Sequence, residues 1–276
     1  MIDLNRSFWG KAWSVISDAT GHLNADDGWA MASNVALTWL MALFPFLIFV
    51  AAVAGTVGDS GLASRVAEML FQTWPVGVAG PIADEVRRVL RPAHSGLLTV
   101  SAAVALFLAT SGVEAVRTAL NRAYRVVDRR SFIWLRLQSL VFVLVGTIVI
   151  LLLAGVVVAS TALRLPEPFA SLVTTVGTSV TSILVVGVLL AAHLWLPAGR
   201  PPWQQLWPGI VATLVLWAVS AWAFAYYLRL FGNYAATYAG LAGVVTAMFF
   251  LYVVSVVLIF GAEFNAAICR LRERKI

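Results

Sequence analysis

Two groups of polar residues interrupt otherwise apolar stretches of this sequence, and they are the residues that could carry chemistry. The first group is Ser111, Glu114, Arg117 and Asn121, spaced by three, three and four positions. On a helix that spacing places all four side chains on one face, with Glu114 within ion-pairing reach of Arg117. Polar groups are costly inside apolar helices, so they indicate a cavity, a gate or a polar junction between helices.

The second group is Glu263 and Asn265, which follow Gly261 near the end of the last apolar stretch. Asn34, near the start of the first stretch, is a similar polar position. The two groups are expected at the same end of their helices, so an ion pair between Glu263 and Arg117 is a hypothesis. For Glu114 with Arg117, a cavity and a purely structural junction are equally favoured. For Glu263 and Asn265 a cavity or gate is favoured.

No arrangement typical of an enzyme accompanies these residues. The sequence lacks a Ser–His–Asp or Cys–His order, a phosphate-binding Gly-Lys-Ser/Thr loop and a zinc-binding helix motif. The single cysteine, Cys269, excludes an internal disulfide framework, and His22, His94 and His193 do not have the spacing of metal ligands. We therefore expect no catalytic residue, no metal, no cofactor and no enzymatic activity.

The composition indicates that lipid surrounds these groups. Of the 276 residues, 61% are hydrophobic and only 12% are charged, and the mean hydropathy is +0.89. A soluble domain has about half apolar and about a quarter charged residues. We predict an all-α, polytopic membrane helix bundle whose main partner is the lipid bilayer. The net charge of +6 does not indicate nucleic-acid binding, because no polar domain is large enough to hold such a surface.

The apolar stretches are long enough to cross a bilayer as helices. Residues 1–29 are expected to form an N-terminal amphipathic segment, 30–267 a six-span transmembrane domain, and 268–276 a basic cytoplasmic tail. Six spans are expected, together with an outer amphipathic helical hairpin over 58–95; the spans cover about 30–57, 96–124, 137–163, 170–196, 209–231 and 240–267.

Three local features refine this map. Pro45 lies inside the first span and predicts a kink, because its ring removes a hydrogen bond and crowds the preceding turn. A rigid loop is expected from Pro197 to Pro208. Near the N-terminus, residues 5–20 are expected to form an amphipathic helix. Apolar residues that include Trp9 and Trp13 recur at helical spacing on one face, opposite Arg6, Lys11 and Asp18. That helix either lies in the headgroup layer or packs on the rest of the protein, and the two alternatives are equally favoured.

The distribution of lysine and arginine predicts the orientation. With both termini in the cytoplasm, thirteen of the 19 basic residues fall on the inner side and six on the outer side. Most of the inner ones lie in the connector after span two and in the C-terminal tail, which are short segments where the rule is strongest. We expect a multi-pass protein with a cytoplasmic N-terminus and a cytoplasmic C-terminus.

Short motifs along the chain resemble one known family. An outer loop is expected at Asn233-Tyr234-Ala-Ala-Thr237-Tyr238, and Gly261-Ala-Glu263-Phe-Asn265-Ala-Ala267 follows in the last span. With Leu43-Phe44-Pro45, Leu120-Asn121-Arg122-Ala-Tyr124 and Trp207-Pro208-Gly209, they resemble the YihY family, also called the BrkB virulence-factor family and once labelled ribonuclease BN. Two positions depart from the usual pattern, Ala239 in place of glycine and Phe250 in place of tryptophan.

The resemblance implies a bacterial inner-membrane protein with six spans, of a family whose members are described as transporters, exporters or factors of envelope resistance. We expect a transporter or exporter of an unidentified small solute. One alternative is a structural or assembly protein of the envelope, and a weaker one is an intramembrane enzyme. Ribonuclease activity is not expected, because the acidic residues outside the spans do not cluster.

One structural criterion separates the first two functions. A water-filled cavity lined by Asn34, Glu114 or Glu263 would favour transport, and a packed bundle in which these groups are paired would favour the structural role. The sequence has no ATP-binding motif, so transport would be driven by a gradient, passive, or dependent on a partner. Assembly of several copies is compatible with the sequence.

Overall fold

The protein is entirely helical over the residues that the structure describes. This computed structural model describes residues 8–57, 95–162, 167–199, 202–237 and 241–273. Those residues contain seven helices and no strand, which confirms the predicted fold class. The helices are α1 (Phe8–Ala25), α2 (Gly28–Val57), α5 (Ser95–Ala123), α6 (Phe132–Ala162), α7 (Glu167–Trp195), α8 (Trp203–Thr237) and α9 (Leu241–Glu273).

Four of the helices contain stretches that are long and apolar enough to cross a membrane. They are Phe132–Val149 in α6, Thr175–Trp195 in α7, Trp203–Tyr227 in α8 and Val244–Leu271 in α9. A shorter apolar stretch covers Gly28–Leu43 in α2. The C-terminal half of α5 carries Glu114, Arg117 and Arg122, which lower its hydropathy. The chain is therefore a polytopic helical membrane protein, and the number of six spans stays a prediction.

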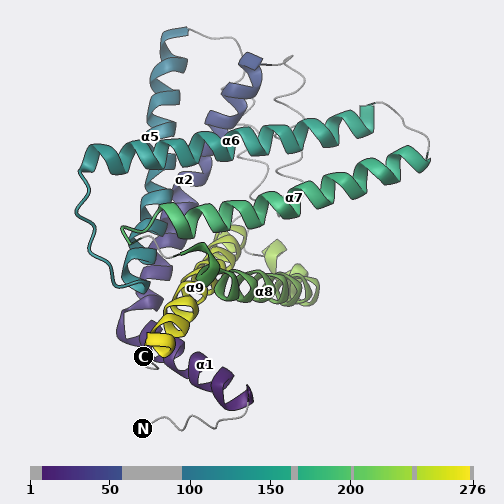
Figure 1. The fold of residues 1–276 in the computed structure, drawn as a ribbon. Helices are drawn as coiled ribbons and strands as arrows, with labels where there is room; N and C mark the ends of the chain where they lie inside the picture. Colours follow the sequence, from purple (N-terminus) through teal and green to yellow (C-terminus); the bar gives the residue numbers. More distant parts are fainter. Residues whose placement is uncertain (1–7, 58–94, 163–166, 200–201, 238–240, 274–276) are drawn as a thin grey trace.

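The helices pack in two antiparallel pairs, α2 with α5 and α6 with α7, and the second pair crosses the first at a steep angle (Figure 1). Helices α2 and α5 lie side by side, and α9 contacts α2, α8 and α1. Helices α6 and α7 form an antiparallel hairpin in which α6 contacts α5 and α7 contacts α8. The core lies where α1, the start of α2, the end of α5, the end of α7, the start of α8 and the end of α9 meet. Its largest fully buried apolar side chains are Val35, Leu120, Leu196, Leu206 and Ile210.

Outside this core, α6, α7 and α8 expose many apolar side chains, as helices that face lipid do. Examples are Val145 and Ile148 on α6 and Val176 and Ile183 on α7. Exposed tryptophans are found mainly near the helix ends that surround the core, which is typical of the membrane–water interface. They are Trp13, Trp29, Trp134, Trp195, Trp203 and Trp207.

Helix α1 packs on α9 and α2 through its buried residues Ala19 and Leu23. Trp13, on another side of α1, is exposed. The packed arrangement, one of the two alternatives for this helix, is thus observed. The chain then turns at Asp27, whose φ of 56° lies in the left-handed region. Aspartate tolerates this region better than most residues, because its short side chain can bond locally.

Helices α8 and α9 approach each other closely at two glycines. A Cβ at Gly209 would overlap the Gly261 carbonyl oxygen and the Asn265 side chain, and a Cβ at Gly261 would overlap the Thr213 hydroxyl. Small residues allow such close helix crossings in membranes. The crossing fixes the position of Asn265 against the first turns of α8.

Two predicted element boundaries differ from the structure. Helix α8 begins at Trp203, so part of the predicted loop up to Pro208 is helical, and Pro208 lies inside the helix. The predicted outer loop is also different, because Asn233 and Thr237 have helical backbone in the last turns of α8. Tyr238 and the predicted hairpin 58–95, up to residue 94, lie outside the described residues. Pro45 lies inside α2, which continues on both sides of it.

Candidate functional site

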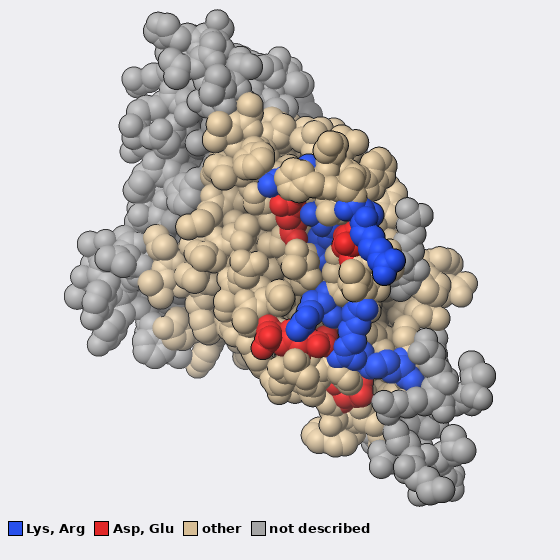
Figure 2. All heavy atoms as spheres, turned by 90° about the vertical axis from the view of Figure 1, so that its left-hand side faces the viewer, with Lys and Arg blue, Asp and Glu red and all other residues tan. Residues whose placement is uncertain are grey.

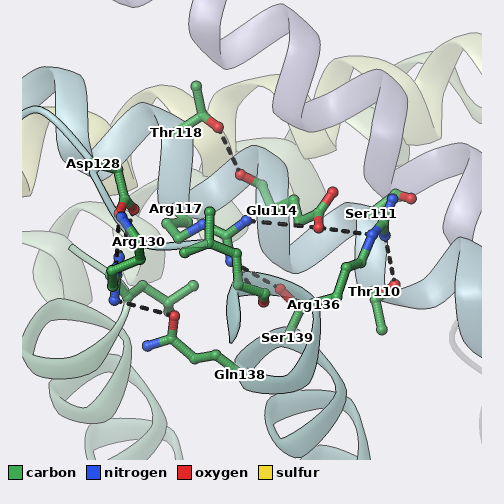
Figure 3. A network of polar contacts seen from close by, with 12 residues as sticks. Thr110, Ser111, Glu114, Arg117, Thr118, Asp128, Arg130, Arg136, Gln138 and Ser139 are labelled. Atoms are coloured by element: carbon green, nitrogen blue, oxygen red, sulfur yellow. Dashed lines mark hydrogen bonds and ion pairs between the residues drawn. The ribbon is translucent and has the colours of Figure 1, made fainter. Parts of the chain in front are cut away.

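The polar face of α5 forms a network with the first turns of α6 (Figure 3). The Arg117 side chain is 7% exposed, and its Nη2 lies 3.6 Å from Glu114 Oε1, so the predicted pair within α5 is confirmed. Its Nη1 donates to the Leu135 carbonyl at 3.0 Å and to the Ser139 hydroxyl at 3.1 Å. Arg117 therefore holds α5 and α6 together from inside the protein.

Arg136 on α6 is the second cation of this network. Its Nε lies 3.1 Å from Glu114 Oε1, and its Nη1 donates to the Thr110 hydroxyl at 2.9 Å. The guanidinium lies over the Phe107 ring, 4.4 Å from the ring centre, in cation–π geometry. Glu114 is thus shared by two arginines and lines neither of the pockets described below. It has the geometry of a junction between helices.

The α5–α6 connector joins both helices to the end of α7. Asn121 donates from Nδ2 to Asp128 Oδ2 at 3.1 Å and accepts the Ala198 N–H at 2.8 Å. Arg130 Nη2 lies 2.6 Å from Asp128 Oδ2 and also donates to the Leu196 carbonyl at 2.6 Å. Hydrogen bonds from Arg130 lower the pKa of Asp128 to about 2. Asp128 is therefore ionised at neutral pH and fixes the connector.

Asn265 on α9 completes the hydrogen bonding of α8 around its proline. Pro208 has no N–H, and its ring disturbs the preceding helical turn. The buried Asn265 amide accepts the Gly209 N–H at 2.7 Å and donates to the Leu206 carbonyl at 3.0 Å. One side chain thus supplies both a donor and an acceptor to the backbone of a neighbouring helix.

Glu263 is 1% exposed, and its Oε2 lies 3.7 Å from Arg270 Nη2, with no hydrogen-bond partner in the described part of the chain. Arg270 also donates from Nε and Nη2 to Asp18 Oδ2 at 3.0 and 2.8 Å. His22 Nδ1 lies 3.1 Å from the same Nη2. The hypothesis that Glu263 pairs with Arg117 is wrong. Arg270 lies seven residues after Glu263, about two turns along one face of α9, and takes that place.

A pocket of about 410 Å³ opens between the end of α5, the start of α8 and the end of α9. Asn265 is the one predicted site residue that lines it, and Glu263 is its near neighbour in sequence. The polar lining residues are Tyr124, Arg125, Gln205, Asn265, Cys269 and Arg270, and the apolar ones are Val126, Gly199, Pro202, Leu206 and Ala266. This pocket is the candidate site, because it combines polar groups with a concave, mostly apolar wall.

Tyr124 connects the pocket to a buried histidine. Its hydroxyl lies 2.8 Å from His193 Nδ1, and the two rings meet edge to face. His193 is fully buried in α7, and its Nε2 has no hydrogen-bond partner among the described residues. The pocket wall is therefore backed by a polar pair from two helices.

A second pocket, of about 320 Å³, lies between α2, α5, α6 and α9. Its lining is apolar and includes Trp39, Phe46 and Phe142. Trp39 donates from its indole N–H to the Gly112 carbonyl at 3.2 Å. None of the predicted polar site residues lines this pocket, so it offers space for apolar groups only.

The remaining predicted site residues either lie outside both pockets or have side chains that the structure does not describe. Asn34 is exposed on α2 and lines neither pocket. Ser111 is half-buried and donates to the Phe107 carbonyl of its own helix at 3.5 Å. The side chains of Asn233, Tyr234 and Thr237 lie outside what the structure describes. Sequence reasoning missed Arg125 as a site residue, because its place in a basic connector indicates only the orientation of the chain in the membrane.

Charged side chains gather on one face of the protein (Figure 2). Figure 2 shows these charges as a single band on an otherwise uncharged face. Ion pairs cross the band between distant segments: Arg125 Nη2 lies 2.6 Å from Asp26 Oδ2, and Arg270 lies 2.8 Å from Asp18. Both of these arginines, Arg125 and Arg270, also line the polar pocket.

Comparison with known proteins agrees with this architecture. The chain is 27% identical over 261 residues to the ribonuclease-like protein YfkH of Bacillus subtilis (strain 168), covering 92% of this chain and 94% of the relative. It is 26% identical over 271 residues to a UPF0761 membrane protein of Rhodospirillum centenum (strain ATCC 51521 / SW), covering 96% of this chain and 60% of the relative.

A UPF0761 membrane protein of Tolumonas auensis (strain DSM 9187 / NBRC 110442 / TA 4) is 25% identical over 167 residues, which are 59% of this chain and 55% of the relative. The chain thus spans little more than half the length of the two UPF0761 proteins. No solved structure matches the chain. The family model described as virulence factor BrkB matches residues 19–276, and the chain belongs to this family of membrane proteins.

Proposed function

We propose that this protein is a transporter that moves a small solute across the bacterial cytoplasmic membrane, with the pocket between Arg125 and Arg270 as its inner vestibule. The observation that carries the proposal is the pocket itself, about 410 Å³ in volume and lined by Asn265 and five other polar residues. Pockets of this size accommodate small ligands. Glu263, buried beside this site with one oxygen lacking a hydrogen bond, supports a functional interpretation of α9.

The proposal places both termini and the pocket on the cytoplasmic side. Its support is the positive-inside rule, by which thirteen of the 19 basic residues are assigned to the inner side. The gathering of charged side chains in one band on the face seen in Figure 2 fits that assignment. A solute would enter the pocket from the cytoplasm. The sequence has no ATP-binding motif, so transport of the solute would be driven by a gradient or would depend on a partner protein.

We also propose that the protein is not an enzyme. The name of the Bacillus relative suggests nuclease chemistry, which needs clustered carboxylates to hold metal ions. Within the described residues, no group of three or more His, Cys, Asp or Glu side chains could hold a metal. Incubation of the purified protein with labelled RNA and Mg²⁺ or Mn²⁺ tests this proposal; cleavage lost in a Glu263→Gln variant would contradict it.

The alternative of a structural or assembly protein has its own support. Glu114 is paired with Arg117 and Arg136, and Asn34 is exposed, so neither lines a cavity. By the criterion set above, these two residues favour the structural role, and so does Glu263, which is paired with Arg270 and does not line the pocket. The support for transport comes from Asn265, a residue outside that criterion, because it lines the pocket.

Assembly of several copies is a further part of the proposal. Apolar side chains on α6 and α7, such as Ile148 and Ile183, are exposed and would be covered by lipid or by a second copy. Light scattering of the protein in detergent counts the copies directly. A single copy at all protein concentrations would contradict assembly and leave the transport proposal intact.

Flux into proteoliposomes tests the transport proposal. A panel of one dicarboxylate (succinate), inorganic phosphate, one diamine (putrescine), alanine and glycerol covers the main charge classes of small solutes. We expect saturable influx of at least one of them and its loss in Glu263→Gln protein that folds normally. Influx no faster than in empty liposomes for every solute, or influx unchanged by Glu263→Gln, would contradict the proposal.

A further inference from the structure

The walls of the polar pocket contain two guanidinium groups and no carboxylate. Arg125 comes from the turn after α5, and Arg270 from the end of α9, so the two cations approach the pocket from different elements. Neither Asp18, Asp26 nor Glu263 is among the lining residues. A ligand in the pocket would therefore meet guanidinium N–H groups, while the carboxylates that pair with them lie behind the wall.

Those carboxylates hold the guanidiniums and leave part of each free. Arg125 uses Nε and Nη2 to bind Asp26 Oδ2, at 3.1 and 2.6 Å. Arg270 uses the same two nitrogens to bind Asp18 Oδ2. Neither Nη1 group has a hydrogen-bond or ion-pair partner within the described residues. Each Nη1 carries two N–H groups, so four donors remain for a ligand.

The backbone at Arg125 is also unusual. Its φ of 54° lies in the left-handed region, where a residue other than glycine is uncommon. The Arg125 N–H donates to the Arg122 carbonyl, and the Val126 N–H donates to the Asn121 carbonyl, which is the Schellman pattern at a helix end. Glycine would suit that position better. An arginine there costs backbone energy, and such strain is found at functional sites.

We infer that the pocket binds the oxyanion, carboxylate or phosphate, of a small organic molecule. The Nη1 groups of Arg125 and Arg270 would donate to the oxyanion, as guanidinium groups do to carboxylates and phosphates. Val126, Leu206 and Ala266 would contact an apolar part of the ligand. If the protein is a transporter, this anion is the transported solute, and that conclusion rests on the proposed function. Binding of the anion in the pocket does not depend on the proposed function.

The two sources of such an oxyanion are a soluble metabolite and a lipid headgroup at the inner surface of the membrane. Binding is therefore measured in nanodiscs of zwitterionic phosphatidylcholine. The probes are succinate, inorganic phosphate and short-chain dihexanoyl phosphatidylglycerol. Saturation by succinate or phosphate indicates a soluble anion, and saturation by the phosphatidylglycerol alone indicates a lipid headgroup.

Cys269 provides a direct readout of occupancy. It is the only cysteine in the chain and it lines the pocket, so a maleimide reagent labels a single known position. We expect at least one of the three probes to slow labelling in a saturable way, by about tenfold at saturation. Sodium chloride at equal ionic strength should leave the rate unchanged. Labelling that no probe slows would overturn the inference.

Two variants separate the pocket from general electrostatics. Arg125→Gln removes one donor group, and a charge-assisted hydrogen bond of about 1.5–3 kcal/mol corresponds to at least about tenfold weaker protection of Cys269. Arg129→Gln removes the same charge from an exposed position on the same connector, outside the pocket, and should leave protection unchanged. Equal effects of the two variants would overturn the assignment.

Arg270→Gln also removes the partner of the buried Glu263 and can unfold the protein. Arg125→Lys is the second variant instead, because it keeps the charge and loses the fork of N–H donors. Binding weakened by Arg125→Lys supports recognition by hydrogen bonds. Binding without any flux would contradict transport and leave the anion site standing; flux without protection of Cys269 would overturn the anion site alone.

Discussion

Replacing Asn265 by alanine removes the side chain that joins α9 to the first turns of α8. Two buried backbone groups then lose their partners, the Gly209 N–H at 2.7 Å and the Leu206 carbonyl at 3.0 Å. A buried donor or acceptor left unpaired costs about 1–3 kcal/mol. The two together predict that Asn265→Ala lowers the free energy of unfolding by about 2–6 kcal/mol.

The matched control is Asn34→Ala, which truncates an asparagine that is exposed on a helix and should cost less than about 0.5 kcal/mol. The chain contains 11 tryptophans, so intrinsic fluorescence follows unfolding in detergent without a label. Denaturant titrations of the wild type and both variants give the three free energies. An equal loss in both variants would refute the role assigned to Asn265.

Asn265→Asp sharpens the same test. The carboxylate still accepts the Gly209 N–H, but it no longer donates to the Leu206 carbonyl and places negative charge beside it. We expect this variant to be destabilised as well, because one of the two hydrogen bonds is replaced by repulsion. A fully stable Asn265→Asp protein would show that the bond to Leu206 contributes little.

Three further predictions concern packing and charge. Gly261→Ala introduces a Cβ into the α8–α9 crossing and should lower the midpoint of thermal unfolding by several degrees, whereas Gly146→Ala meets no atom within 4 Å and should not. Arg117→Met leaves its buried acceptors without a donor and should cost about 3 kcal/mol in a denaturant titration. Asp128→Asn should cost at most about 2 kcal/mol at pH 7, because Arg130 lowers the pKa of Asp128 from 3.8 to about 2. The pKa of Asp128 is lower in the folded protein than in the unfolded chain, so this stabilisation is complete above about pH 4 and is lost as the pH falls towards 2. The free energies of unfolding of the wild type and of Asp128→Asn should therefore become equal near pH 2.

The all-helical membrane fold and the α5 polar face followed from sequence patterns. A three-, three- and four-residue spacing fixes which side chains share a helix face, and the Glu114–Arg117 pair is formed at 3.6 Å as expected. Such local geometry is set by the helix itself. It needs no knowledge of how the helices pack.

The partner of Glu263 could have been obtained in the same way, because Arg270 lies seven residues later on one face of α9, but the contact of Arg270 with α1 could not. Arg270 binds Asp18, 252 positions away, and that contact depends on α1 packing against α9. The pocket depends on the same packing, because Tyr124, Gln205 and Arg270 come from three separate segments. Sequence spacing carries no information about which ends of distant helices meet.

The start of α8 differs from the sequence prediction for another reason. The sequence predicts a loop from Pro197 to Pro208, a stretch that contains four prolines. Here Pro208 is accommodated within α8 while Asn265 bonds the backbone on both sides of it. Tertiary contacts thus compensate a local break that sequence rules treat as the end of a helix.

The most direct test of a transporter with an inner anion-binding vestibule is influx of succinate and of inorganic phosphate into proteoliposomes that contain wild-type, Arg125→Gln or Arg129→Gln protein. We predict saturable influx of at least one of the two anions with the wild type and with Arg129→Gln, and at least about tenfold slower influx of that anion with Arg125→Gln below saturation. Equal influx for all three proteins, or none above that of empty liposomes, would contradict this account.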